Sequence, residues 1–288
     1  MIKFGPAGHS ASFLAEGKKH TYEMPEWLKN KGLDIFEYSF GRGVNIKEDS
    51  ARLIGAKAKE FGIEMTVHAP YYINFATEEK EKAENNVRYV MQSLEVLSYF
   101  EGTRVVIHTA SQGKLERAQA LKNASCALEK LAEKVISSGY GDKLLCLETM
   151  GKKSQIGNVD EIVEFCKISP IFIPTMDFGH INACFQGILK TKDDYRREID
   201  KVFNALGEEK AKKIHIHFSK IQYSQAGEIR HLTFGDDVYG PEFSPLAEIL
   251  LEYDMEPYVI CESAGMQAED ALIMKTEFIN MRNNPLQN

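Results

Sequence analysis

Six histidine and acidic residues stand at the ends of short apolar segments, where their side chains could do metal chemistry. In chain order they are His68, His108, Glu148, Asp177, His217 and Glu262. Mixed imidazole and carboxylate ligands suit zinc, and also manganese or iron. Successive members are 40, 40, 29, 40 and 45 residues apart, which is the length of a strand, a loop, a helix and a return loop. This spacing predicts an α/β fold, a (β/α)₈ TIM barrel, in which the carboxyl ends of all strands meet on one face.

The elements that must position these residues follow from the hydrophobic pattern. Strands are predicted at residues 2–5, 35–38, 65–68, 105–108, 143–148, 171–177, 214–217 and 258–262. Helices are predicted at 24–31, 47–61, 77–100, 114–136, 158–168, 193–206, 245–253 and 268–281, with Asn158 as a side-chain cap. The alternation covers the chain without a linker, so we expect one domain over residues 1–288.

Composition bounds the class of protein. The chain has 288 residues, 43% of them hydrophobic and 27% charged, as in ordinary globular proteins. It has no 18-residue apolar run and no basic segment followed by a long apolar stretch at its start, so we expect a cytoplasmic protein without membrane contact. The five cysteines show no CxxC spacing, which argues against a disulfide framework or a cysteine zinc site. The net charge of -7 decides little about nucleic-acid binding, because bound cations would offset the acids of the pocket.

The acids carry more information than any one histidine. A single histidine at a strand end is usually structural. However, Glu148, Asp177 and Glu262 would repel one another at a common face unless a cation lay between them. In the segment 214–217, His217 is the better candidate for the pocket, and we expect His215 to pack one layer lower in the barrel.

Several motifs together resemble a known family. They are residues 68–74 (HAPYYIN), His108, 148–157 (ETMGKKSQIG), 177–180 (DFGH), His217 and 261–263 (CES). Over nearly the whole chain this set resembles endonuclease IV, the apurinic/apyrimidinic endonuclease of the xylose-isomerase-like barrels. The resemblance implies a DNA repair hydrolase that acts on damaged double-stranded DNA. It would cleave the phosphodiester on the 5′ side of an abasic site and leave a 3′-hydroxyl.

The resemblance also implies a cofactor of two or three Zn²⁺ ions, with Mn²⁺ as another possible metal. A first ion would be held by His68, His108 and Glu148. Glu148 would bridge to a second ion, which is also held by Asp177, His217 and Glu262. A third ion would be held by His180 and His231. Glu148 and Glu262 would be the catalytic residues, the first by bridging and the second by orienting.

The third of these sites departs from the family pattern. The family's loop normally reads Asp-Arg-His, whereas this chain has Ile229-Arg230-His231 with Glu228 one place earlier. Either Glu228 reaches the ion with its longer side chain, or the third site is weakened and the cluster works with two ions.

Contacts to DNA are expected from loops beside the pocket. Tyr71 and Tyr72 could stack on or wedge between bases, and Arg42 could enter the gap left by a displaced nucleotide. Lys152, Lys153 and Lys220 could hold backbone phosphates. No obligate protein partner is evident.

Two other functions remain open at this stage. A metal-dependent sugar isomerase or epimerase on the same barrel would place Glu148, Asp177, His217 and Glu262 around one ion. Such an enzyme has no need for the additional histidines. A non-catalytic binding protein that had lost the third site is the other alternative, and only the shift to Glu228 favours it.

Overall fold

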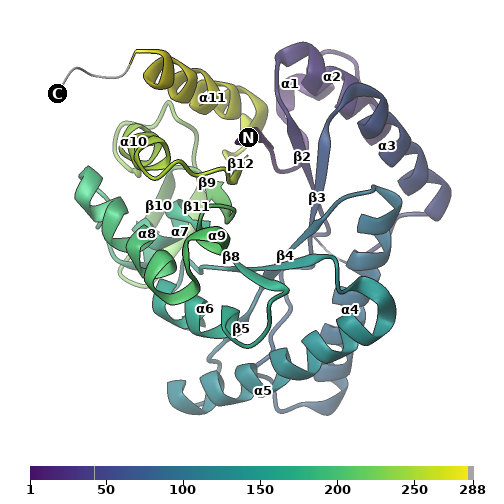
Figure 1. The fold of residues 1–288 in the computed structure, drawn as a ribbon, viewed down its shortest axis with the longest axis vertical. Helices are drawn as coiled ribbons and strands as arrows, with labels where there is room; N and C mark the ends of the chain where they lie inside the picture. The colour runs from purple at the N-terminus through teal and green to yellow at the C-terminus, as the bar shows by residue number, and fades with distance from the viewer. Residues whose placement is uncertain (42, 285–288) are drawn as a thin grey trace.

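Eight parallel strands form a barrel in the computed structural model, which describes residues 1–41 and 43–284 (Figure 1). Around the barrel the order is β1, β12, β9, β8, β6, β4, β3, β2. In chain order these strands are β1 Lys3–Pro6, β2 Ile35–Ser39, β3 Glu64–His68, β4 Arg104–His108, β6 Leu144–Glu148, β8 Phe172–Asp177, β9 His215–Phe218 and β12 Tyr258–Cys261. Each lies within one residue of its predicted bounds at either end, so the predicted barrel is confirmed.

The first and second strands close the barrel. A parallel bridge joins Ala7 to Glu37, and the amide of Gly8 donates to the carbonyl of Glu37 at 3.0 Å. Gly5 lies at this junction, where a Cβ atom would sit 1.8 Å from the carbonyl oxygen of Ile35. Only glycine fits such a close approach of two backbones.

The predicted helices form the outer layer (Figure 1). They are α2 Met24–Lys31, α3 Glu48–Phe61, α4 Lys80–Tyr99, α5 Arg117–Val135, α6 Val159–Cys166, α8 Lys192–Leu206, α10 Ser244–Glu252 and α11 Gln267–Asn283. Their apolar faces pack on the strands in one large core. The Asn158 side chain accepts from the amide of Glu161, as the capping prediction required. In the part of the chain that the structure describes, no helix is long and apolar enough to cross a membrane.

Several short elements were not predicted. They are α1 Ala11–Ala15, a 3₁₀ helix Thr21–Glu23, a π-helical turn Ile136–Tyr140, α7 Phe178–Cys184, α9 Glu208–Ala211, the strand pair β5 Ala110–Ser111 and β7 Gln155–Ile156, and the hairpin of β10 Ile221–Ser224 and β11 Gly227–His231. Two of them matter for the site. Helix α7 begins directly after β8, and the β10–β11 hairpin follows β9.

The barrel interior is polar one layer below the strand ends. Because side chains alternate along a strand, the residues two places before those that face the cavity or the candidate metal site form a lower layer. In this barrel that layer includes the buried side chains of Glu37, Thr66, Cys146, Thr175 and His215. An ordinary TIM barrel fills such a layer with branched apolar residues. In this barrel, buried polar side chains lie directly beneath the residues of the upper face.

Candidate metal centre

A cavity of about 1060 Å³ opens at the carboxyl ends of the strands. Its walls come from segments after β3, β6, β9 and β12, and its floor carries His68, His108, Glu148 and Glu262. The predicted ligands therefore converge on one hollow although they are spread over nearly two hundred residues of sequence. Glu148 lies at the centre of this group.

The carboxylate of Glu148 contacts histidines on both of its oxygens. Oε2 lies 3.0 Å from Nε2 of His68 and 3.1 Å from Nε2 of His108. Oε1 lies 3.1 Å from Nδ1 of His217 and 3.4 Å from Nδ1 of His180. A carboxylate placed in this way can bridge two ions, one on each oxygen.

A second group surrounds His217. Glu148, Asp177, His217 and Glu262 each offer a ligand atom, and these atoms lie within 4.8 Å of one another. Nδ1 of His217 is 3.5 Å from Oε2 of Glu262. The buried Oδ2 of Asp177 lies 3.2 Å from Nδ1 of His180 but makes no well-aligned hydrogen bond among the described residues, so this oxygen is available to a cation.

The third group depends on a β-bulge in the β10–β11 hairpin. Gln222 pairs with Arg230 and Tyr223 with Glu228, which leaves Ile229 without a partner in the ladder. In a regular strand, residues three apart face opposite sides, but the bulge absorbs one residue. Glu228 and His231 consequently share a face. The oxygens of Glu228 lie 3.5 Å from Nε2 of His180 and 3.8 Å from Nε2 of His231.

This geometry bears on the two alternatives for Glu228. The chain has one residue more between its acid and His231 than the Asp-Arg-His pattern, and the bulge compensates for it. Glu228, His180 and His231 offer ligand atoms within 4.8 Å of one another. The arrangement favours the alternative in which Glu228 takes the place of the usual aspartate.

Each of the five candidate histidines also contacts an oxygen outside the cluster. Four of them face a neutral oxygen through Nδ1. For three the oxygen is a backbone carbonyl: that of Ala69 for His68 (2.7 Å), of Tyr71 for His108 (3.2 Å) and of Thr149 for His180 (3.0 Å). For His231 it is the hydroxyl of Ser219 (2.8 Å). His217 differs, since its Nε2 lies 3.0 Å from Oε1 of Glu37. Such outer contacts fix the ring orientation of metal-binding histidines.

The pKa values of the acids are shifted in different directions, upward by burial and like charges and downward by the histidines. Burial, together with the charges of Glu262 and Glu148, raises the pKa of Asp177 to about 6, although His180 opposes this. Burial also disfavours ionisation of Glu262, but the charge and hydrogen bond of His217 outweigh it and lower the pKa of Glu262 to about 2. The pKa of Glu148 is well below its usual range, because His108 and His217 more than compensate for its burial.

The buried histidines respond to these acids. Burial alone would lower the pKa of His217, but Glu262, Glu37 and Glu148 raise it well above its usual value. The pKa of His180 is raised in the same way by Asp177 and its neighbours, against its burial. Without a metal, His180 and His217 therefore bind protons more tightly than ordinary histidines do. Bound cations would take over that role.

The residues expected to contact DNA have different environments. Tyr71 lines the cavity, with its ring 4.9 Å from that of His68, and its side chain is half-exposed. Tyr72 is also half-exposed, but its ring packs edge-on against Tyr89 of α4. Arg42 lies outside the described residues.

The lysines also differ from one another. Lys152 lines the cavity and Lys153 is exposed beside it. Lys220 is 5% exposed, and its ammonium donates to the carbonyl of Asp236 at 2.8 Å and pairs with Glu242. The prediction that Lys220 holds a phosphate is wrong, because its charge is already used inside the protein.

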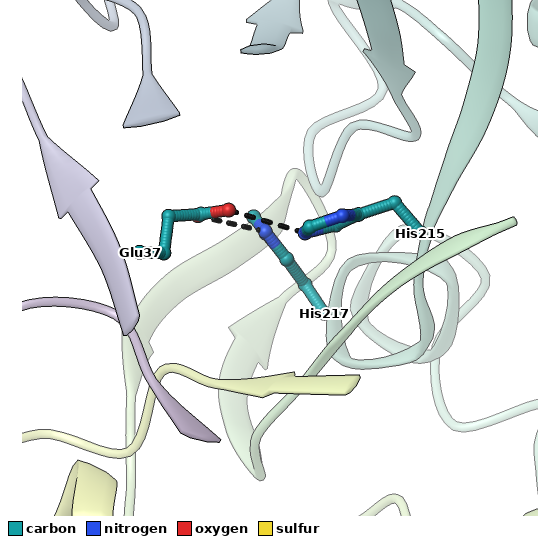
Figure 2. A group of neighbouring side chains, drawn as sticks. All are labelled: Glu37, His215 and His217. Carbon is teal, nitrogen blue, oxygen red and sulfur yellow. Dashed lines mark ion pairs between the residues drawn. The ribbon is translucent and has the colours of Figure 1, made fainter. Parts of the chain in front are cut away.

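Sequence reasoning missed Glu37. This residue lies on β2, is fully buried and points across the barrel toward His215 and His217 of β9 (Figure 2). Nε2 of His215 is 3.1 Å from Oε2 of Glu37, so His215 does pack one layer below the pocket, as predicted. An acid inside an apolar strand was the available signal: Glu37 lies between Phe36 and Tyr38.

Comparisons with known proteins agree with this architecture. The family model of the xylose isomerase-like TIM barrel matches residues 25–281. An uncharacterized protein of Methanocaldococcus jannaschii, MJ0133, is 32% identical over 96% of both chains. A probable endonuclease 4 of Aquifex aeolicus is 24% identical over 77% of this chain and 78% of its own.

Solved structures of two kinds share the fold. Endonuclease IV from Thermus thermophilus superposes with a TM-score of 0.67 at 16% identity, covering 96% of this chain and 99% of its own. A D-tagatose 3-epimerase-like protein superposes with a TM-score of 0.73 at 20% identity, covering 98% of both chains. At these identities the likeness concerns the fold, which nucleases and epimerases have in common.

Proposed function

The chain belongs to the xylose isomerase-like TIM-barrel family, and we propose that it is a metal-dependent endonuclease that cleaves DNA on the 5′ side of abasic sites, leaving a 3′-hydroxyl. One observation carries this proposal. The four-residue group around His217 is extended on both sides, by His68 and His108 and by the group of His180, Glu228 and His231. A single ion would not need these additional ligands.

The donor set fits two or three zinc ions. Glu148, Asp177, Glu262 and Glu228 carry four negative charges when ionised, which two divalent ions would balance. A third ion would leave the pocket positive, as a site for a phosphodiester requires. The buried carboxylate of Asp177 and its raised pKa of about 6 support the presence of a cation, because burial and the charges of Glu262 and Glu148 disfavour the ionised carboxylate when no cation is bound. Bound divalent ions supply charge that stabilises a phosphoryl group under attack and lower the pKa of water.

The protein's own residues would bind and orient the substrate. Glu262 faces the cavity and, with a pKa of about 2 in the metal-free protein, stays ionised at neutral pH. It can orient a water molecule or accept a proton from it. Glu148 lies at the floor of the cavity, almost fully buried, and has both oxygens directed at ligand histidines. It would keep the two halves of the cluster at a fixed separation.

The cavity walls suit a displaced sugar-phosphate. Tyr71 offers a ring over His68, and Lys152 and Arg230 offer positive charge at the opening. Damaged double-stranded DNA is therefore the proposed partner, with Tyr71, Tyr72 and Arg42 as the proposed DNA contacts. An abasic nucleotide is selected because it lacks base pairing, which lowers the energy of extruding it from the helix.

A sugar epimerase or isomerase is the second candidate. Glu148, Asp177, His217 and Glu262 alone could hold one ion, and acids beside such an ion can transfer protons at a sugar carbon. This candidate does not account for Glu228 and the bulge that directs it into the cavity.

Incision of a duplex with one tetrahydrofuran abasic analogue tests the proposal, because the analogue cannot react by lyase chemistry. We expect cleavage on its 5′ side with a 3′-hydroxyl product, by protein as purified or after loading with zinc or manganese. An undamaged duplex is the substrate control. No cleavage by protein with verified metal content would contradict the proposal, and epimerisation of ketohexoses by the same sample would establish the second candidate.

A further inference from the structure

Glu37 is the buried acid that the proposed chemistry does not use. Its carboxylate lies in the lower interior layer, is fully buried, and lies 3.0 Å from Nε2 of the candidate ligand His217. An ionised carboxylate in such a place is costly unless several donors surround it. Burial does oppose its ionisation, but the charges and hydrogen bonds of His217 and His215 hold the pKa of Glu37 below its usual range.

The two oxygens of Glu37 have different partners. Oε1 lies 3.0 Å from Nε2 of His217. Oε2 accepts a hydrogen bond from the Thr66 hydroxyl at 2.9 Å and lies 3.1 Å from Nε2 of His215. Thr66 and His215 thus hold one oxygen in place. The carboxylate of Glu37 also faces His217 (Figure 2).

His217 presents the opposite ring edge from His68 and His108. Those two histidines direct Nε2 at Glu148, whereas His217 directs Nδ1 at Glu148 and Glu262. A carboxylate at Nε2 keeps the proton on that nitrogen, which leaves the lone pair on Nδ1 for a metal ion. A carboxylate also makes the imidazole a stronger donor to the metal than a carbonyl does.

We propose that Glu37 is a positioning residue for the metal ligand His217, with Thr66 and His215 holding its carboxylate in place. This role rests on the proposed metal centre, but not on the choice between nuclease and epimerase. An alternative is that Glu37, His215 and His217 hold an ion of their own, since their donor atoms also lie within 4.8 Å. His217 would then have to bind ions through both ring nitrogens and lose both protons, which makes this arrangement less favourable.

Zinc binding by the full chain tests the proposal. Glu37→Gln keeps the size of the side chain and removes its charge. We expect zinc-saturated Glu37→Gln to hold as many ions as the wild type, with the affinity for one of them weaker by roughly 10- to 100-fold in competition with a chelator. Glu198→Gln is the matched control, because Glu198 is buried on α8 and pairs with Lys201 away from the cavity.

A spectroscopic readout separates positioning from general loss of structure. In the zinc-loaded wild type with ¹⁵N-labelled histidine, we expect a downfield, slowly exchanging proton on Nε2 of His217. It should move upfield in Glu37→Gln and stay in place in Glu198→Gln. If Glu37→Gln does not fold, Thr66→Val is the second variant, with affinity expected to fall by roughly two- to tenfold, the effect of one lost hydrogen bond.

Three outcomes would overturn the inference. Equal zinc affinity of Glu37→Gln and Glu198→Gln would show that Glu37 has only a structural role. If Thr66→Val is tested instead, an unchanged zinc affinity would have the same meaning. One ion fewer in saturated Glu37→Gln would make Glu37 a ligand itself. A wild type that binds neither zinc nor manganese would refute the proposed metal centre and the role of Glu37 with it, and this result is distinct from the other two.

Discussion

Asp177 should make the metal-free protein less stable as pH rises, and Asp177→Asn should remove this loss. The pKa of Asp177 is raised from 3.8 to about 6, first because of burial and then because of Glu262 and Glu148. Between these two values the unfolded chain releases the proton and the folded protein retains it. The free energy of unfolding therefore falls as the pH rises through this range, and the full loss persists above pH 6.

The size of the effect follows from the shift. About two pKa units at about 1.4 kcal/mol each give roughly 3 kcal/mol. Asparagine keeps the cap on α7, where Oδ1 of Asp177 accepts from the amide of His180 at 2.7 Å, but it does not ionise. Part of this loss is already present at pH 4, so the stability of Asp177→Asn minus that of the wild type should increase by roughly 2.5 kcal/mol from pH 4 to pH 8.

Urea unfolding of chelator-treated protein at several pH values measures this difference. Comparing the two proteins at each pH cancels the constant cost of the substitution. Zinc-saturated samples are the control, and there the wild type should be the more stable protein because the ion binds its folded form more tightly. A difference that stays constant from pH 4 to pH 8 in the metal-free samples would refute the reasoning.

Three further predictions concern the site and its frame. Glu262→Gln should reduce incision of the tetrahydrofuran duplex by at least about a hundredfold, because it removes a proton acceptor that faces the cavity. The unfolding midpoint should change little, and full activity of the variant would exclude the proposed role. Deletion of Ile229, the residue without a partner in the ladder, should leave the metal content unchanged, because Glu228 and His231 then share a face in a regular strand. Loss of one ion per chain, measured by elemental analysis, would contradict the proposed role of the bulge. Gly5→Ala should destabilise the protein by more than about 3 kcal/mol in urea unfolding, since its Cβ would overlap a carbonyl of β2; an unchanged midpoint would show that the barrel closure relaxes.

The sequence by itself determined the barrel and the position of its pocket. Strands ended by His68, His108 or Glu148 are visible as short apolar segments, and their spacing leaves room for one helix each. The barrel rule then places these ends on one face without knowledge of any contact. Local signals worked for the same reason: the cap at Asn158 depends only on residues within one turn of it.

Tertiary structure decided which atoms meet within that face. Glu37 is an isolated acid in the sequence, and its role depends on the layer that β2 occupies opposite β9. The face shared by Glu228 and His231 depends on a bulge that only the pairing of two strands defines. Lys220 looks like a free cation in the sequence, but in the structure it is buried and its ammonium contacts Asp236 and Glu242. These features depend on how segments distant in the chain pair and on which interior layer each residue occupies. Hydrophobic periodicity does not encode either of these.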